Sequence, residues 1–342
     1  MFNRYHRTYR RSAQTHVRRR ARRVIALALA AAAAAAVPAS GAGSASPAIV
    51  GVAVHPDWTG TAWERHDDLM LALSEERLRF ARGGNPALAT TRAWARKCRD
   101  RGIAVLLAAD VALVSNDGRE AERVAAFRAG LAQVLADGVT VLGIEGINEP
   151  DLEIPKRAAE GKVLLRPGED WLGYAVRHTK TLSPLAHEAG LPMVAPTIGH
   201  PFEHPEVADR ASWAGYVDIA NAHPYPYITA PLTWEASGGP RRHFDYARRA
   251  AGVERVWATE TGYFSDSGLT NAQVAAWAPD LLSVLDRAGF ERVAWYTLID
   301  RTSKFWVWYT LTDRKGLFSV SSTGAFTVKP QGLAVRDWIL AH

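Results

Sequence analysis

The sequence predicts an α/β protein built as a (β/α)8 TIM barrel, a single domain that follows an N-terminal export signal. Short runs rich in aliphatic and β-branched residues alternate with longer amphipathic runs over residues 48–342. This alternation is typical of a parallel sheet whose strands are joined by helices. Eight strand candidates, with no glycine-rich nucleotide fingerprint after the first, favour a closed barrel over an open doubly wound sheet.

The elements follow one another in regular order. The predicted strands are residues 48–54, 77–81, 103–109, 139–147, 192–198, 217–223, 255–261 and 292–299. The predicted helices are residues 62–75, 88–100, 120–137, 169–189, 243–251 and 271–288. Several helix candidates end in glycine, the usual residue at a helix C-terminus. The fifth and sixth strands are separated by a short segment with no strong helical pattern.

Residues 1–47 have the composition of a signal peptide with a small-residue linker. They contain nine arginines and no acid, then the apolar run "VIALALAAAAAAAV", Pro38 and the small residues "ASGAGSASPA". The run is short for a membrane span, and cleavage after Ala39, Ala42 or Ala45 fits the small-x-small rule. We therefore expect a secreted, periplasmic or cell-envelope protein without stable membrane insertion after cleavage. Arg22-Arg23 is compatible with a twin-arginine route, and the alternative is an uncleaved anchor helix.

Charge and cysteine content narrow the class of protein further. The whole chain has 41 basic and 35 acidic residues, so removing the nine leader arginines leaves 32 against 35, a net charge of −3 for the remainder. A mildly acidic surface of mixed sign excludes a nucleic-acid partner. Cys98 is the single cysteine, so no internal disulfide can form. Its place in a helix candidate argues against a catalytic role for Cys98. Separately, we expect the protein to be a monomer.

Polar residues gather where predicted strands end, which is the side on which barrels build their sites. Strand four ends in "INEPD" with Asn148 and Glu149, and strand seven ends in "TETGYF" with Glu260. Two glutamates at one barrel mouth suit glycosidic bond cleavage, which needs one protonated acid and one ionised carboxylate. Glu145 has the same alternation parity as Glu149 and is expected to be a buried, hydrogen-bonded carboxylate.

Other strand ends and two long connections complete the expected mouth. Strand six ends in "HPYP" and strand eight in "AWYTLIDR", and the polar connection 151–170 and the aromatic connection 300–316 follow strands four and eight. Aromatic rings can stack on the apolar face of a sugar. The aromatic candidates are Tyr263, Phe264, Trp295, Tyr296, Trp306 and Trp308.

The ordered set "NEP", "HPY", "ETG" and an aromatic pair at four strand ends resembles clan A of the retaining glycoside hydrolases, near families 5 and 39. The resemblance implies Glu149 as general acid/base and Glu260 as nucleophile of a double displacement. It further implies the following substrate-binding and supporting residues: Asn148 at the 2-hydroxyl, Arg79 or in its place Arg82, His223 and Tyr225 orienting the nucleophile, and Trp295 or Tyr296 as sugar platform. Tyr263 is expected to line the mouth.

Arginine, histidine and tyrosine near Glu260 would keep it ionised, whereas Glu149 without such partners would hold its proton. The mechanism implied needs no cofactor and no metal; the histidines of "GHPFEHPE" are separated by prolines and have no obvious third ligand.

The expected function is that of an exported retaining glycoside hydrolase that cleaves a β-linked poly- or oligosaccharide by double displacement, in endo mode. Three alternatives stay open. They are an exo-acting β-glycosidase of the same clan, a catalytically silent carbohydrate-binding barrel, and a structural cell-envelope protein tethered by its leader. Sugar identity and linkage depend on loop geometry that no pattern in the sequence determines.

Overall fold

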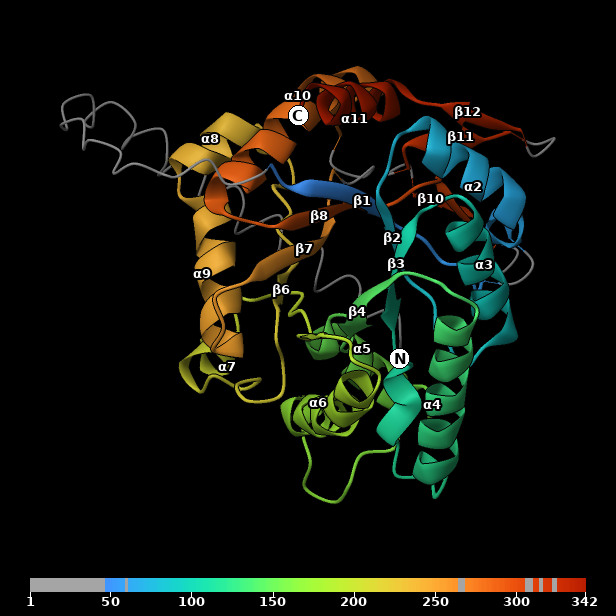
Figure 1. Ribbon diagram of the computed structural model, residues 1–342. Helices are drawn as coiled ribbons and strands as arrows, with labels where there is room; N and C mark the ends of the chain where they lie inside the picture. The colour runs from blue at the N-terminus through green and yellow to red at the C-terminus, as the bar shows by residue number, and fades with distance from the viewer. Residues whose placement is uncertain (1–46, 59–60, 264–267, 305–309, 314–315, 322–324) are drawn as a thin grey trace, which may run out of the picture. The chain divides into compact units, whose positions relative to one another are not determined.

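A ring of parallel strands surrounded by helices forms the centre of the computed structural model (Figure 1). The structure describes residues 47–58, 61–263, 268–304, 310–313, 316–321 and 325–342. The ring strands are β1 (Ile49–Ala53), β2 (Phe80–Arg82), β3 (Ala104–Ala108), β4 (Val141–Glu145), β5 (Met193–Val194), β6 (Ala220–Ala222), β7 (Val256–Thr261) and β8 (Arg292–Trp295). The expected leader, with Phe264, Trp306 and Trp308, lies outside the described residues.

The strands pair in the order β5-β4-β3-β2-β1-β8-β7-β6. Hydrogen bonds close the ring between the two remaining edges, because the backbone N–H of Ala195 donates to the carbonyl of Ile219 at 2.8 Å. Each named pair is parallel, from Ile49 opposite Arg292 to Ala220 opposite Val256. The predicted (β/α)8 barrel is therefore confirmed.

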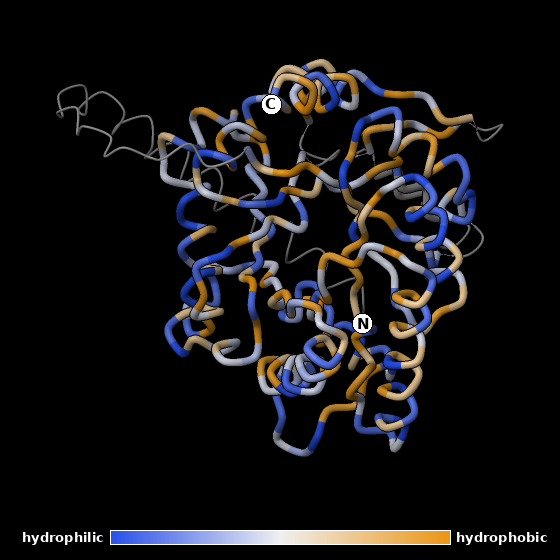
Figure 2. The backbone as a smooth tube through the Cα atoms, viewed as in Figure 1, coloured by the Kyte–Doolittle hydropathy of each residue, from blue (hydrophilic) through white to orange (hydrophobic). Residues whose placement is uncertain are grey.

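Helices cover the outside of the ring (Figure 1). The main ones are α2 (His66–Glu75), α3 (Ala89–Asp100), α4 (Glu120–Ala136), α6 (Trp171–Glu188), α9 (Gly239–Ala251), α10 (Asn271–Ala288) and α11 (Pro330–Ala341). Their sequences alternate between hydrophilic and hydrophobic positions (Figure 2), so that one face packs on the strands and the other meets water. No helix among the described residues has the length and apolar character needed to cross a bilayer.

Several short elements were not predicted. Helix α5 (Pro150–Ala159) begins directly after Glu149, α7 (Pro205–Asp209) is the only α-helix described between β5 and β6, and α8 (Pro231–Ala236) precedes α9. The 3-10 helix η2 (Val111–Val114) follows β3, whereas the 3-10 helix η1 (Ala62–Glu64) lies at the start of the helix predicted over residues 62–75. Two hairpins, β9 (Arg301–Lys304) with β10 (Thr310–Asp313) and β11 (Phe318–Val320) with β12 (Phe326–Val328), follow β8.

The register contains one irregularity that shapes the site. Ala258 of β7 pairs with Val293 of β8, and Thr261 pairs with Trp295, so β7 advances three residues while β8 advances two. One extra residue in a strand is a β-bulge, which interrupts the alternation of side chains and re-aims them. Thr259 and Glu260 lie within this bulge.

Candidate active site

Glu149 stands at the junction of β4 and α5. Its backbone is left-handed, with φ 43° and ψ 60°, and it is the residue that precedes the first turn of α5, where Pro150 follows. A non-glycine residue in this conformation costs on the order of 1–3 kcal/mol and persists only where the surroundings enforce it. Its side chain retains 24% of its exposure, so it is accessible from solvent while anchored at a rigid helix end.

Glu260, near the end of β7, is held from two sides. Its Oε1 accepts from Arg82 Nη1 at 2.5 Å and its Oε2 accepts from the Tyr225 hydroxyl at 2.9 Å. The side chain is only 8% exposed. Hydrogen bonds and a permanent positive charge favour the ionised form of a carboxyl group.

The two carboxyl groups share one site, as expected. One oxygen of Glu149, one oxygen of Glu260 and one nitrogen of His223 all lie within 4.8 Å of one another. Retaining glycosidases place the two carboxyl groups about 5–5.5 Å apart, whereas inverting enzymes need about 6.5–9.5 Å to admit a water. The two carboxyl groups are therefore close enough to act on one bond.

Arg82 links these groups to the barrel interior. Its Nε and Nη2 donate to the two oxygens of Glu145 at 2.6 and 3.0 Å, and Nη2 also donates to Asn148 Oδ1 at 2.6 Å. Burial disfavours the charged guanidinium, but the charges of Glu145 and Glu260 outweigh burial and raise the pKa of Arg82 further. Glu145 is fully buried, as its parity predicted.

The strand-two arginine of the site is Arg82, and the expectation of Arg79 was wrong. The strand runs from Phe80 to Arg82, three residues later than its predicted start, and the exposed Arg79 precedes it. Gly83 follows with φ 144°, and a Cβ there would meet the carbonyl oxygen of Val54 at 2.1 Å. Only glycine allows this close approach, so β2 ends at Arg82. Arg82 is therefore the last residue of β2 whose side chain points into the barrel.

His223 contacts Glu149 more closely than Glu260. Its Nδ1 lies 2.9 Å from Glu149 Oε1 and 3.7 Å from Glu260 Oε2, while its Nε2 lies 3.2 Å from Thr259 Oγ1. The resemblance had implied that His223 orients Glu260. The tyrosine of the same strand end, Tyr225, does contact the nucleophile, and burial followed by the charge of Glu260 raises its pKa well above the ordinary value.

The expectation that Glu149 lacks a partner and simply keeps its proton was therefore wrong. Burial alone would raise the pKa of Glu149, but the hydrogen bond and charge of His223 outweigh it and lower that pKa. Burial would lower the pKa of His223, and the charges of Glu260 and Glu149 with the hydrogen bond to Glu149 raise it instead. Glu149 and His223 therefore titrate together as one hydrogen-bonded pair.

Two polar residues of the site were missed by the sequence analysis. Thr259 Oγ1 donates to Glu145 Oε1 at 2.7 Å, and Asn221 Nδ2 donates to the same oxygen at 2.8 Å. Asn221 lies inside the predicted strand six, and its polarity within an otherwise apolar run was the available signal. Thr259 gave no such signal, because its direction depends on the bulge in β7.

The aromatic expectations need two corrections. Trp295 is fully buried, so its ring has no face open to a sugar. Tyr263 is also buried, with its ring against Trp277 of α10 and its hydroxyl directed to the carbonyl of Thr229 at 3.4 Å. Both rings serve packing.

Tyr296 is the partly exposed aromatic residue at the end of β8. The ring of His55 lies 5.8 Å from that of Tyr296 and stacks on Trp58 with centroids 3.7 Å apart. His55 and Trp58 are likewise partly exposed and follow β1. Together these three rings form an aromatic group that joins the ends of β1 and β8.

The loop after β5 is fastened beside Glu149. Asp151 accepts hydrogen bonds from the backbone N–H groups of Gly199 and His200 at 2.8 and 2.9 Å. A Cβ on Gly199 would meet Leu152 Cδ1 at 2.7 Å and Glu149 Cδ at 3.3 Å. The loop therefore approaches Glu149 closely, and a methyl group at this position would displace the Leu152 side chain and crowd the Glu149 carboxyl group.

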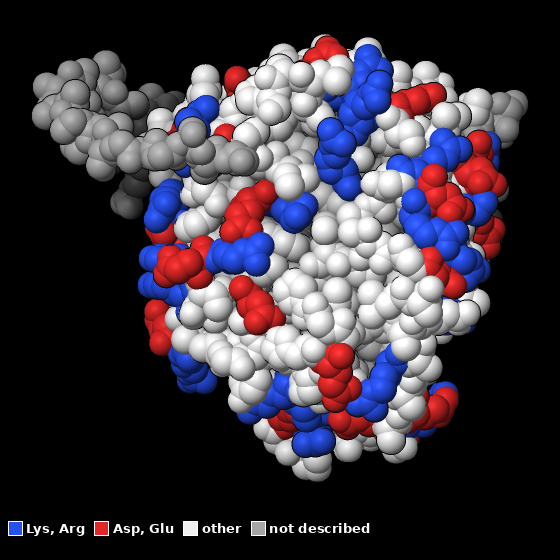
Figure 3. Space-filling view, in the orientation of Figure 1, with Lys and Arg blue, Asp and Glu red and all other residues white. Residues whose placement is uncertain are grey.

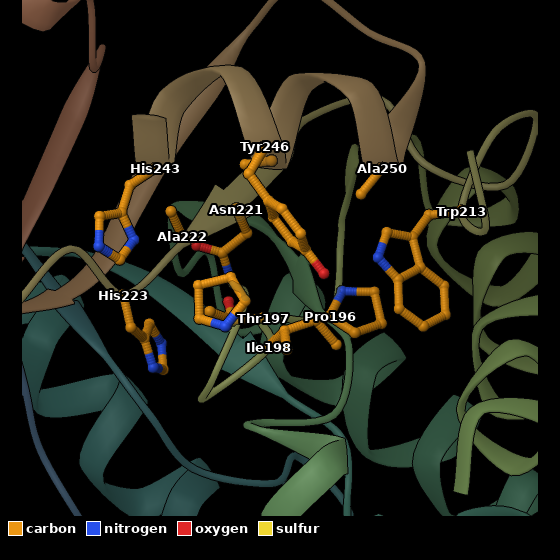
Figure 4. A pocket seen from close by; sticks show the side chains of 12 residues that line it. Pro196, Thr197, Ile198, Trp213, Asn221, Ala222, His223, His243, Tyr246 and Ala250 are labelled. Carbon is orange, nitrogen blue, oxygen red and sulfur yellow. The ribbon is translucent and has the colours of Figure 1, made fainter. Parts of the chain in front are cut away.

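A small cavity lies behind His223 (Figure 4). His243 and Tyr246 point into it from α9, opposite Pro196 and Thr197 of the β5 loop. Burial lowers the pKa of His243 to about 3. The hydroxyl of Thr197 is buried and has no hydrogen-bond partner within the described part of the chain.

Glu149, His223 and Glu260 have the spacing of a three-ligand cation site as well as that of an acid/base group. Arg82 already donates to Glu260, so the protein itself places a permanent positive charge there. We interpret the trio as an acid/base group.

On the face shown in Figure 3, charged side chains of both signs are intermixed toward the rim, and the middle is mostly uncharged.

Comparison with known proteins was informative only at the level of structure. No family model matches the sequence, and no curated protein does. A GH5_18 protein from Bifidobacterium longum subsp. infantis matches with TM-score 0.60 and 14% identity over 86% of this chain and 78% of that chain. The exo-β-1,4-mannosidase Op5Man5 from Opitutaceae bacterium strain TAV5 matches with TM-score 0.59 and 17% identity over 85% and 59%.

A third match is a β-glucuronidase from Ruminococcus gnavus, with TM-score 0.57 and 13% identity. The alignment covers 85% of this chain and 50% of that one, so this chain spans about half the length of the glucuronidase. The three matches show that the chain shares the (β/α)8 barrel fold of these proteins, the fold that the alternation of strand and helix patterns predicted.

Proposed function

We propose that the protein is a retaining glycoside hydrolase that cleaves β-linked sugars. The observation that carries the proposal is the pair of opposed carboxyl groups, Glu149 and Glu260, with one oxygen of each within 4.8 Å of the other at the ends of β4 and β7. Glu260 is the nucleophile, because Arg82 and Tyr225 donate to both its oxygens and leave it as a carboxylate. The more exposed Glu149 is the acid/base.

The reaction proceeds in two displacements. Glu260 attacks the anomeric carbon while a proton passes from Glu149 to the departing glycosidic oxygen, and a covalent glycosyl-enzyme forms. Glu149, now a carboxylate, removes a proton from water, which attacks the same carbon and releases the sugar with its configuration retained. Asn148, whose amide oxygen is held by Arg82, directs its NH2 group as the donor to a sugar hydroxyl.

Single substitutions of the two glutamates test the assignment. Glu260→Ala is expected to abolish turnover of every β-glycoside, by about 10⁴-fold or more, because no covalent intermediate can form. Glu149→Ala is expected to lose about 10²–10⁴-fold on sugars with poor leaving groups and far less on activated aryl glycosides, which need no proton. Azide added to Glu149→Ala should give a β-glycosyl azide. Near wild-type hydrolysis by either variant would refute the proposal.

We further propose that the substrate is an oligo- or polysaccharide attacked in endo mode. Support comes from the partly exposed rings of Tyr296 and Trp58, which can stack on sugar faces, and from the aromatic connection that follows β8. Incubation with a panel of β-glucans, mannans, xylans and microbial exopolysaccharides, followed by product sizing, tests the mode. Mid-length products released early support endo action, and monosaccharide alone supports the exo alternative.

Export through the leader is a separate proposal that rests on the composition of residues 1–47. Mass determination of the N-terminus of the secreted protein should give a start near residues 40–46. Retention of the intact N-terminus would favour the anchored form. Replacing Arg22 and Arg23 by lysine is expected to block export if the twin-arginine route is used.

A further inference from the structure

The hydroxyl of Thr259 sits between a carboxylate oxygen and a histidine nitrogen, and a count of the available hydrogens decides which of them it donates to. It lies 2.7 Å from Glu145 Oε1 and 3.2 Å from His223 Nε2. A hydroxyl group has one hydrogen to donate. The question is which of these two neighbours receives it.

Glu145 must receive it. The two oxygens of Glu145 already accept from Arg82 Nε, Arg82 Nη2 and Asn221 Nδ2, at 2.6, 3.0 and 2.8 Å. A carboxylate surrounded by these donors has no hydrogen of its own, so a hydroxyl at 2.7 Å can only be its donor. The oxygen of Thr259 is then an acceptor toward His223, and Nε2 of His223 carries a hydrogen.

The tautomer of His223 determines what passes between His223 and Glu149. With a hydrogen fixed on Nε2, the 2.9 Å contact from Nδ1 to Glu149 Oε1 contains one further proton. Either Nδ1–H donates to the carboxylate, or the carboxylic acid donates to the bare Nδ1. Both forms hold the same single proton, and without it two acceptors would face each other.

We propose that Thr259 and Glu145 are positioning residues that hold His223 as the Nε2–H tautomer, so that His223 and Glu149 share the one proton delivered to the leaving group. The inference rests on the proposed function and deepens it. In the first displacement the shared proton leaves with the glycosidic oxygen, and the pair becomes a neutral imidazole beside a carboxylate. In the second displacement water returns one proton to the pair, which closes the cycle.

The opposite tautomer could not do this. If Nδ1 carried the only N–H hydrogen, transferring it to Glu149 would leave both ring nitrogens without a hydrogen. The ring would then be an imidazolate anion of very high basicity. The charged and titratable groups around the pair come from β2, β4, α5, β7, α9 and the loop after β6. They are Glu145, Asp151, Arg82, Tyr225, Glu260 and His243.

Thr259→Val tests the proposal, with Thr259→Ser as its matched control. Valine keeps the shape but removes the acceptor for Nε2–H, whereas serine keeps the hydroxyl. Glu145 retains its three other donors in the valine variant, so the fold should persist. The alkaline limb of kcat/KM on a poor-leaving-group substrate is expected to move down by about one pH unit in Thr259→Val. Thr259→Ser should restore it, and an activated aryl glycoside should show little change.

A nitrogen NMR measurement on the intact wild-type protein tests the same point without relying on turnover. The Nε2–H signal of His223, assigned by its loss in His223→Gln, should persist through neutral pH, while Nδ1 changes its protonation together with Glu149. In Thr259→Val the neutral ring should become the Nδ1–H tautomer. A bare Nε2 in the wild type, or an unmoved alkaline limb in Thr259→Val, would overturn the proposal. If no glycoside were hydrolysed, the proposed function would fail while the NMR result still decided the tautomer.

Discussion

Glu76 is a buried carboxyl group for which the structure predicts a large pH effect on stability. It follows the last residue of α2, it is fully buried, and neither oxygen has a hydrogen-bond partner among the described residues. Burial raises its pKa from 4.5 to about 7, opposed by the charge of Arg336 and reinforced by Glu75 and Asp337. The native state therefore holds this proton where the unfolded chain has lost it.

The sign follows from proton linkage. Below pH 4.5 the carboxyl group is protonated in both the native and the unfolded state, so its ionisation does not affect the free energy of unfolding. Between 4.5 and about 7 the native state binds more protons than the unfolded state, so the free energy of unfolding falls as pH rises. At 1.36 kcal/mol for each pH unit the full loss is about 3 kcal/mol, and because water can relax around the ionised group we expect about 2 kcal/mol.

Glu76→Gln removes this charge while keeping the volume. In urea unfolding at pH 8, we expect the free energy of unfolding of the variant to exceed that of the wild type by about 2 kcal/mol. At pH 4.5 the difference in the free energy of unfolding should be much smaller. Glu75→Gln, at the exposed neighbouring position, is the control and should change stability by less than about 0.5 kcal/mol at either pH. A stability difference between Glu76→Gln and wild type that is the same at both pH values would refute the reasoning.

Three further substitutions test the site. Tyr225→Phe removes the donor to Glu260 and should lower kcat on every substrate by about tenfold or more, measured by steady-state kinetics. Gly199→Ala places a methyl group near the carboxyl group of Glu149. The free energy of unfolding, measured in urea, should fall by about 1–3 kcal/mol, and the displaced Glu149 should lower kcat. Thr197→Val should lower the free energy of unfolding by about 1 kcal/mol if a water molecule in the cavity binds the threonine hydroxyl. A higher thermal stability of this variant would show that the cavity is dry.

The barrel and its two glutamates were predictable because they depend on local patterns. Strand and helix periodicities, with glycines at helix ends, place the carboxyl ends of the strands on one side of the barrel whatever the details of packing. Glu149 and Glu260 must then meet near one mouth. The same parity argument correctly buried Glu145 beneath them.

Two of the wrong assignments depend on strand register. A strand that begins at Phe80, three residues later than predicted, makes Arg82 the site arginine. Whether Trp295 or Tyr296 faces the mouth is one residue of register, and successive side chains of a strand point to opposite faces. Sequence periodicity locates a strand only to within a few residues, so it cannot decide between such neighbours.

By itself, the sequence determined the fold class and the pair of acids at the strand ends, because each depends on short-range periodicity. Only the tertiary structure decided which carboxyl group His223 contacts, and that Thr259 joins Glu145 to that histidine. The physical reason is the bulge in β7, a single extra residue between Ala258 and Thr261 that turns Thr259 and Glu260 toward the interior together. Such a change in direction arises from pairing with a distant strand, so no local pattern records it.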